Sequence, residues 1–400
     1  MSDHICTPGC THGIAEENRK DVLDEFDTAR RSFLSNTLVG GGAVGLGAPG
    51  LGMTPMAQAA SGVTGSDPDA PGPRHYYIPA TPDTVLWGYF SKVANPVLEI
   101  ESGDYVTMET LTHHANDDAD RMVKGDPGAE AVFFWDANRK GVDRRGTGPM
   151  DAAIGAGGGA GVHICTGPVR IKGAQPGDIL EVRIADVVAR PSGNPSFKGK
   201  SFGSNAAANW RFQYGDLLNE PKKREVVTIY EVDITGERNW AQAVYNFRWT
   251  PQTDPFGVAH PTIDYPGVPV DHSTIDKQFG VLAKAQIPVR PHFGVMAVAP
   301  RESGMVDSIP PSYFGGNMDN WRAGKGARLF LPVSVAGALF SVGDPHASQG
   351  DSELCGTAIE CSLTGVFQLV LHKQRDILLI AIAFARSTYS LPAASKRRMA

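Results

Sequence analysis

The stretch PVRIKGAQPGDILEVRIADVVA, residues 168–189, carries the pattern that decides the fold. Within it Leu180, Val182 and Ile184 alternate with the residues of the opposite face, and a period of two is typical of a β-strand. Glycine and proline in the preceding GAQPGD mark a turn. The stretch therefore predicts β-structure next to a tight turn.

Similar β-prone runs, separated by turn signals, continue along the chain from His75 onward. Few segments carry a helical stripe longer than two turns. The pattern predicts a mainly β protein, either a sandwich or a barrel-like body with long functional loops. The runs span residues 84–90, 97–111, 161–167, 224–234, 243–249, 293–300, 327–343 and 365–373.

Composition excludes some functions. The 400 residues are 42% hydrophobic and 20% charged, enough for one large domain or two average ones. A formal net charge of -6 gives no basic surplus for phosphate backbones, so nucleic-acid binding is not expected. Forty-six glycines and 29 prolines divide the chain into short segments, which again favours strands and loops.

The first 59 residues read as a targeting segment. Arg30 and Arg31 precede a weakly apolar run, residues 38–56, and then Ala-Gln-Ala at 57–59, which together match a twin-arginine export signal. The run is too polar and too broken to span a bilayer as a stable membrane helix. We expect residues 60–73 to be a flexible linker and the protein to be periplasmic or secreted. A mobile arm with a chance arginine pair is the alternative.

Cleavage after this segment would leave three cysteines, Cys165, Cys355 and Cys361. An odd, low number argues against a disulfide framework, although one pair stays open.

GALFSVGDPHASQGDSELCGTAIE, residues 337–360, concentrates acids and one histidine in what its glycines predict to be a loop. If the chain is extended there, Asp344 and His346 point to the same side and can act as metal ligands. Glu353 and Glu360 are candidate ligands or a general base whose pKa burial would raise. The alternative is a set of solvated acids with His346 capping a turn.

Two further histidine segments are candidates. In THHANDD, residues 112–118, a regular strand cannot turn both histidines toward one ion, so we expect His114 with Asp117 as the ligand pair, or else an exposed polar turn. His163 lies among apolar neighbours, as a catalytic histidine or as a hydrogen-bonded core residue.

The segment GGNMD, residues 315–319, offers a place for the substrate. The amides of Gly315 and Gly316 are candidates for an oxyanion nest, with Asn317 orienting a carboxamide and Asp319 as a ligand. A plain β-turn is the competing account.

Four of these segments, residues 161–184, 290–300, 310–321 and 331–360, resemble in content and order the acetamidase/formamidase family. The resemblance covers about residues 75–373. It implies hydrolysis of short-chain aliphatic amides to a carboxylate and ammonia. It also implies a jelly-roll-type β-sandwich with few short helices, so we expect a catalytic domain at 74–373, a small amide substrate and a homo-oligomer.

Amide hydrolysis needs a strong nucleophile, oxyanion stabilisation and a proton for the amine, and a divalent ion supplies the first two. We therefore predict a metal ion, Zn²⁺ or Ca²⁺. The expected ligands are Asp344, His346, His292, Asp319 and His114, and the expected catalytic residues are Glu353, Glu360, Asn317 and His163.

Two rival functions use the same segments. Thiolate attack by Cys165 would place the chemistry next to His163. A non-catalytic β-sandwich would instead use the acidic loops to hold a structural Ca²⁺.

Two other expectations concern the pocket and the end of the chain. Aromatic residues are candidate pocket walls, although most are expected in the core. Residues 374–400 differ from the longer continuation usual in the family, and we expect a truncated or frame-shifted end. The aromatic candidates are Trp87, Phe134, Trp135, Phe202, Trp210 and Trp321.

Overall fold

The structure is a computed structural model that describes residues 63–65, 72–134, 162–207, 225–234, 239–254, 257–263, 267–351, 353, 355–373 and 383–386. All of them belong to one compact unit of the chain, Met56–Ala400. The predicted export signal, residues 1–59, lies outside the described residues. Residues 64 and 65, within the predicted linker, form a short strand, and most of that segment lies outside the described residues.

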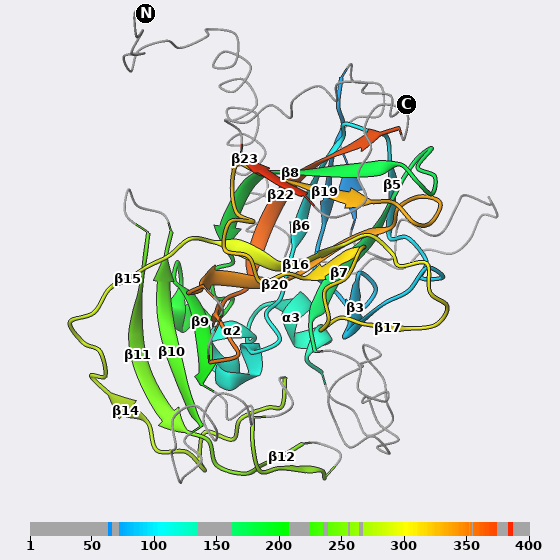
Figure 1. Ribbon diagram of the computed structural model, residues 1–400. Helices are drawn as coiled ribbons and strands as arrows, with labels where there is room; N and C mark the ends of the chain where they lie inside the picture. The colour runs from blue at the N-terminus through cyan, green and yellow to red at the C-terminus, as the bar shows by residue number, and fades with distance from the viewer. Residues whose placement is uncertain are drawn as a thin grey trace, which may run out of the picture. The chain divides into compact units, whose positions relative to one another are not determined.

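The first sheet has seven strands and is antiparallel except for the parallel pair β2 and β6. In spatial order it comprises β1 (Thr64–Gly65), β2 (His75–Ile78), β6 (Tyr105–Glu109), β22 (Leu363–His372), β8 (Ile179–Ala189), β19 (Ala327–Pro332) and β23 (Ala383–Arg386). Figure 1 shows β23, in red, at the edge beside β19.

The second sheet has twelve strands. Its main path runs through β14 (Gln278–Phe279), β11 (Trp240–Arg248), β10 (Val226–Asp233), β9 (Ser201–Ala207), β21 (Ile359–Glu360), β20 (Phe340–Ser348), β16 (His292–Ala297) and β18 (Gly315–Asn317). Four more strands branch from this path: β15 (Ile287–Pro288) on β11, β7 (Ile164–Ile171) on β20, and β3 (Val85–Trp87) and β5 (Leu98–Ile100) on β7.

Short elements complete the described part of the chain. Two small antiparallel pairs join β12 (Gln252–Thr253) to β13 (Ala259–His260), and β17 (Val306–Asp307) to β4 (Tyr89–Phe90), which is distant in sequence. The helices are η1 (Ala115–Asp118), α2 (Ala119–Met122), α3 (Pro127–Val132) and η2 (Pro195–Phe197). Figure 1 shows α2 beside β9.

One hydrophobic cluster joins the two large sheets. It includes Leu180 and Val182 of the first sheet and Val295 and Val342 of the second, all fully buried. The ring of Phe367 on β22 lies 5.2 Å from that of Phe293 on β16, measured between centroids. The predicted period of two in residues 179–185 therefore places one face of β8 in the core between the sheets.

Several short connections among the described residues carry the chain from one large sheet to the other. The run 97–111 divides at a turn into β5 and β6, which lie in different sheets, and residues 172–178 likewise separate β7 from β8. The run 327–343 divides into β19 and β20 at residues 333–339, which include positive φ angles at Ala338 and Leu339. Each of these runs, which look continuous in sequence, therefore contains two strands, one in each of the two large sheets.

The predicted mainly β fold with few short helices is confirmed, but the strand order does not show a jelly roll. The prediction that residues 337–360 form a loop is wrong for their first half. Strand β20 occupies residues 340–348, and Phe340 to Ala347 are all buried. The glycines at 337 and 343 favoured a loop there, yet Gly343 is needed because a Cβ would collide with the backbone of β7.

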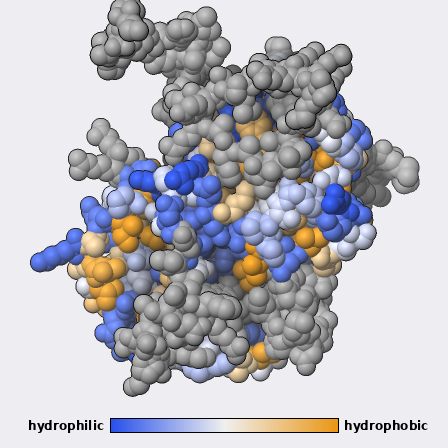
Figure 2. Space-filling model, viewed as in Figure 1, coloured by the Kyte–Doolittle hydropathy of each residue, from blue (hydrophilic) through white to orange (hydrophobic). Residues whose placement is uncertain are grey.

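The viewed surface is mostly hydrophilic, with separate hydrophobic patches (Figure 2). No helix among the described residues is both long and apolar enough to cross a membrane.

Candidate functional site

Three neighbouring strands of the larger sheet bring the first candidate residues together. His346 on β20 lies directly opposite His292 on β16 and opposite Glu360 on β21. Side chains at directly opposite positions of antiparallel strands have Cβ atoms about 5 Å apart. The register alone therefore places Glu360 beside His346, although fourteen positions separate them in the sequence.

Asp344 precedes His346 by two residues, and their side chains meet, with 3.1 Å between Asp344 Oδ2 and His346 Nε2. Strand β20 changes its inward-facing positions here: Phe340 and Val342 belong to the core cluster, but so does Ala347, which has the opposite parity. Asp344 lies within this interval and has a φ of +52°. Its left-handed backbone accompanies the switch that turns the carboxylate and the imidazole toward the site.

Gly294 on β16 provides the space in which the acids converge. A Cβ at this position would collide with the carboxylates of Asp344 and Asp319 and with the ring of His346. Asp319, just beyond β18, also has a positive φ, +40°. Strand β16 lies between β20 and β18, and only a glycine at position 294 of it allows both carboxylates to approach the same point.

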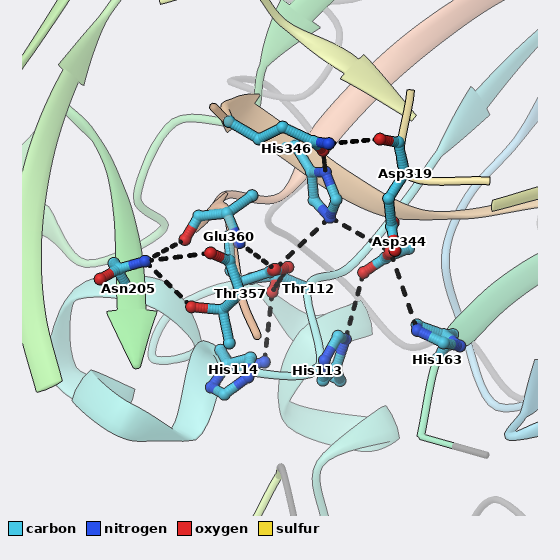
Figure 3. Close-up of polar contacts among 12 residues, drawn as sticks. Thr112, His113, His114, His163, Asn205, Asp319, Asp344, His346, Thr357 and Glu360 are labelled. Carbon is cyan, nitrogen blue, oxygen red and sulfur yellow. Dashed lines mark hydrogen bonds and ion pairs between the residues drawn. The ribbon is translucent and has the colours of Figure 1, made fainter. Parts of the chain in front are cut away.

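Two histidines from other segments approach the Asp344 carboxylate (Figure 3). His113, in the loop after β6, places its Nδ1 3.6 Å from Asp344 Oδ1. His163, just before β7, places its Nε2 3.8 Å from Asp344 Oδ2, and its Nδ1 lies 2.8 Å from Ser308 Oγ. Asp344 thus lies among three buried imidazoles, including that of His346.

His114 turns to a different carboxylate from its neighbour His113. Its Nδ1 lies 3.0 Å from Asp117 Oδ2, which also accepts a hydrogen bond from Ser204 Oγ at 2.6 Å. All of these side chains are buried, so the alternative of an exposed turn is wrong. The two adjacent histidines face separate acids.

Glu360 is held by the segment that precedes it. Its Oε1 accepts the backbone N–H of Ala358 at 3.1 Å and lies 3.4 Å from His346 Nε2. The Asn205 side-chain amide on β9 donates to the carbonyls of Thr357 and Ala358, at 3.2 and 2.8 Å (Figure 3). Asn205 therefore fixes the approach to β21, a role that no sequence motif indicates.

The loop with His113 and His114 begins where β6 ends, and a buried ion-pair network anchors that point. The guanidinium of Arg190, after β8, pairs with Glu109 of β6 and with Asp126, the N-cap of α3. Burial opposes the charged form of Arg190, but the two carboxylates outweigh it and raise its pKa. The network ties three elements together beneath the histidine loop.

The charges in the site perturb one another strongly. Burial alone would raise the pKa of Asp344, but His346 and His163 outweigh it and hold that pKa well below its usual range. Burial disfavours the charged form of His346, and the Asp344 and Glu360 carboxylates nevertheless raise its pKa well above the ordinary value. The two carboxylates thus strongly favour a positive charge at His346 Nε2.

The remaining groups are shifted mainly by burial. It raises the pKa of Glu353 to about 10 and that of Glu360 to about 7, in both cases against the opposing effect of His346. Burial and the Asp344 charge raise the pKa of Asp319. Burial and the neighbouring His114 lower that of His113. At neutral pH this favours a protonated Glu353 and a neutral His113.

Unsatisfied polar atoms mark the centre of the site. Within the described ranges, eight buried side-chain nitrogen or oxygen atoms lack a hydrogen-bond partner, and six belong to this cluster. They are His113 Nδ1, His114 Nε2, Asn317 Oδ1, Asp319 Oδ1, Asp344 Oδ1 and His346 Nε2. Buried polar groups are normally paired, so these atoms indicate that the site binds a further group.

Three overlapping sets of side chains place their ligand atoms within 4.8 Å of one another. Asp344, His346 and Glu360 each belong to two of the sets, so these residues could hold a metal ion. The full sets are His113 with Asp344 and Glu360; Asp319 with Asp344 and His346; and His346 with Glu353 and Glu360. Sequence reasoning had not chosen His113 as a ligand.

Two of the expected ligands lie outside these sets. His292 is buried, and its Nδ1 lies 2.7 Å from the Arg290 carbonyl while its Nε2 lies 2.9 Å from Gln349 Oε1. His114 is held by Asp117, as described above. Both histidines adjoin the site: protein groups contact both nitrogens of His292, whereas in His114 only Nδ1 is paired, with Asp117, and Nε2 has no partner.

The Gly315–Gly316 segment is strand β18 and is not a β-turn centred on Asn317. The Gly315 N–H already donates to the Ser312 carbonyl at 3.0 Å, and a Cβ on Gly315 would collide with the Met296 carbonyl. Gly315 therefore has a packing role, and its amide is not free to serve an oxyanion. Asn317 keeps an unpartnered buried Oδ1 that can accept a hydrogen bond from a ligand.

Cysteine and aromatic candidates fall mostly in the core. Cys165, Cys355 and Cys361 are all free thiols, so no described pair forms the disulfide left open above. Burial raises the pKa of Cys165, which disfavours a thiolate. Trp87 and Phe202 are buried, Phe134 is exposed, and Trp321 stacks between Arg290 and Arg322. Trp135 and Trp210 lie outside the described residues.

A sequence profile described as the Acetamidase/Formamidase family matches residues 159–378, more than half of the chain. The chain belongs to the acetamidase/formamidase family. The match includes β7, β16, β20 and β21, and with them His163, Asp344, His346 and Glu360. His113 and His114 come from the part of the chain before the match.

Relatives in the acetamidase/formamidase family align over half of the chain. An acetamidase of Mycolicibacterium smegmatis is 29% identical over 219 residues, half of each protein. A formamidase of Methylophilus methylotrophus is 31% identical over 219 residues, 50% of this chain and 49% of that protein. The matches thus extend over about half the length of each relative.

The chain was also compared with solved structures, and the TM-scores of the similar ones are below 0.5. A predicted acetamidase/formamidase from Thermoanaerobacter tengcongensis gives a TM-score of 0.47 at 22% identity, covering 78% of this chain and 74% of that one. A gamma lactamase from Delftia acidovorans gives 0.48 at 18% identity, covering 78% and 70%.

Proposed function

We propose that this protein hydrolyses short-chain aliphatic amides such as formamide and acetamide, releasing a carboxylate and ammonia, with the help of a bound divalent metal. The observation that carries the proposal is that four residues of the three overlapping ligand sets, His113, Asp319, Asp344 and His346, each keep a buried polar atom without a hydrogen-bond partner. Family membership supports the reaction class, since relatives are named acetamidase and formamidase.

The donor atoms favour Zn²⁺ over Ca²⁺. Calcium takes oxygen ligands almost exclusively, whereas zinc accepts imidazole nitrogen together with carboxylate oxygen. His346 and His113 offer nitrogen beside the oxygens of Asp344 and Glu360. This mixture argues against a purely structural calcium site. Once bound, the ion would polarise the amide carbonyl and lower the pKa of a water molecule to about 7.

The protein's own groups can supply the remaining steps. Burial raises the pKa of Glu353 in the metal-free site, so where this carboxyl is not a ligand of the ion it can hold a proton and give it to the leaving nitrogen. Asn317 Oδ1 can accept an N–H of the substrate amide and orient it. His163, fixed by Ser308, steadies the Asp344 carboxylate. The buried thiol of Cys165 takes no part in this scheme.

Ammonia release tests the proposal. Protein treated with a chelator should lose hydrolysis of formamide and acetamide, and added Zn²⁺ should restore it. Asp344→Asn should remove both metal binding and turnover, while Asp186→Asn, at an exposed ion pair with Lys325, should keep both. Full activity in protein shown to be free of metal would reject the metal. Metal-loaded protein that releases no ammonia from either amide would reject the amidase.

Export by the twin-arginine route and assembly into a homo-oligomer remain proposals from the sequence. The arginine pair supports the first, and conversion of Arg30 and Arg31 to lysine should then retain a fused reporter in the cytoplasm.

A further inference from the structure

Gln349 lies just beyond β20, between the site and the loop that follows β18. Its side-chain Nε2 donates to the backbone carbonyl of Asp319. A carbonyl oxygen only accepts hydrogen bonds, so the amide nitrogen must face Asp319 and the amide oxygen must face the other way. The reverse orientation would set two acceptor oxygens against each other.

The amide oxygen of Gln349 then faces two histidines. Its Oε1 lies 2.9 Å from His346 Nδ1 and 2.9 Å from His292 Nε2. Because Oε1 is an acceptor, a favourable contact with His346 requires a proton on His346 Nδ1. His292 donates from Nδ1 to the Arg290 carbonyl, and burial lowers its pKa to about 4, so its Nε2 is an acceptor that also faces His346 Nδ1, at 3.2 Å. A neutral imidazole carries one proton, so Nε2 of His346 is left with its lone pair.

That lone pair points to the centre of the site. His346 Nε2 lies 3.1 Å from Asp344 Oδ2 and 3.4 Å from Glu360 Oε1, and it has no hydrogen-bond partner among the described residues. Second contacts of this kind commonly orient metal-binding histidines and fix their tautomer. The His292 ring supports the arrangement, packing edge-on to His346 with centroids 4.9 Å apart.

We propose that Gln349 is a positioning residue, which holds His346 in the tautomer protonated at Nδ1 and thereby presents Nε2 to a metal ion. The same amide fixes the backbone of Asp319, so it positions two members of one ligand set. The proposal about the tautomer is structural, and its consequence for metal binding rests on the proposed function.

Zn²⁺ affinity, measured by competition with a coloured chelator, tests the consequence. Gln349→Met keeps the side-chain length but removes both hydrogen bonds, and we expect a loss of affinity of about 10- to 100-fold. Gln349→Glu restores an acceptor for His346 Nδ1 and should recover part of that loss. An affinity of Gln349→Met equal to that of the unaltered protein would overturn the proposal.

Gln368 on β22 offers a matched control. It is also half-buried, donates its amide to the Gly103 carbonyl at 2.9 Å and accepts from Arg183 at 3.1 Å, but it lies in the other sheet. Gln368→Met should leave Zn²⁺ affinity unchanged. A loss equal to that of Gln349→Met would show a general effect on the fold and would also overturn the proposal.

Nuclear magnetic resonance of ¹⁵N-histidine reads the tautomer directly. In the Zn²⁺-loaded protein the His346 ring proton should lie on Nδ1, and a proton on Nε2 would contradict us. If the protein binds no Zn²⁺ and releases no ammonia, the proposed function fails. The ring proton is then read in metal-free protein at alkaline pH, where the proposal again requires Nδ1.

Discussion

Residues with a left-handed backbone conformation, and one glycine, shape this site. Three of the six non-glycine residues with positive φ in the described chain are Asp319, Asp344 and Glu353, and all three belong to the ligand sets. Such conformations carry strain of about 1 to 3 kcal/mol and persist where surrounding structure holds them. Gly294 contributes in the opposite way, because the site uses the space where its side chain would be.

Replacing Gly294 with alanine should therefore damage the site more than the fold. The new Cβ would push apart the carboxylates of Asp344 and Asp319, so we expect Zn²⁺ affinity to fall at least about tenfold. Overpacking of this kind typically lowers the free energy of unfolding by about 1 to 3 kcal/mol. Calorimetric titration with Zn²⁺ and thermal unfolding measure the two effects.

Gly350→Ala is the control, since a Cβ at Gly350 meets no atom within 4 Å. It should leave both quantities unchanged. A Gly294→Ala protein that binds Zn²⁺ as tightly as the control would show that the acids do not need this space.

For single residues, the sequence predicted the relation between Asp344 and His346 but not the contacts that other residues make with them. The two-residue spacing of Asp344 and His346 placed them on one side, as found. The pairing of His346 with Glu360 could not be predicted, because register depends on which strand lies alongside. Nor could the separate targets of His113 and His114, since an irregular loop has no period to follow.

At the scale of elements, Arg190 joins β6, β8 and α3 through Glu109 and Asp126. The side chain of Arg190 is only 9% exposed, so solvent screens its interactions with Glu109 and Asp126 only weakly. Burial would raise the pKa of Asp126, but Arg190 outweighs it and lowers that pKa below 3.8. The ionised pair therefore stabilises the fold wherever Asp126 is charged.

Arg190→Met should lower the free energy of unfolding by up to about 3 kcal/mol at pH 7, because it leaves two partly buried carboxylates without their cation. The folded-state pKa of Asp126 is lowered, so its contribution is complete above the unfolded value near 4 and is lost as pH falls through the folded value. The difference between the two proteins should thus narrow below about pH 4. Denaturant unfolding from pH 7 to 3 measures it.

Lys124→Met provides the comparison, since Lys124 and Asp120 form an exposed pair, 63% and 61% accessible. A change of about 1 kcal/mol or less is expected there. Equal effects of the two substitutions would contradict the anchoring role of Arg190.

The sequence predicted where β-structure lies along the chain, but not how each β-prone run divides into strands. Alternation located the strands, but runs 97–111 and 327–343 each proved to be two strands in different sheets. The signals were present in ESGD and in AGAL, yet a turn within a run does not say whether the chain returns to the same sheet. That choice depends on packing between layers, which is non-local.

In the whole described unit, both large sheets depend on one core. Phe367 of the first sheet lies between Phe293 and Phe340 of the second, with ring centroids 5.2 and 6.0 Å away. A shared core of this kind predicts that the two sheets unfold in one cooperative transition.

Phe367→Ala should lower the free energy of unfolding by about 3 to 5 kcal/mol, since it removes a fully buried ring and leaves a cavity. Circular dichroism and tryptophan fluorescence should shift together. Phe279→Ala removes a ring that is 68% exposed and should change stability by about 1 kcal/mol or less. Two separate transitions in Phe367→Ala would show that the sheets are independent.

Strand β20 serves the core at Phe340 and Val342 and the site at Asp344 and His346. Substitutions along it would alter stability and ligand geometry at once, which makes it a poor starting point for changing what the site binds. The segments with His113 and Glu353 reach the same centre from loops. Libraries directed at their neighbours could reshape the pocket while the layered framework stays as it is.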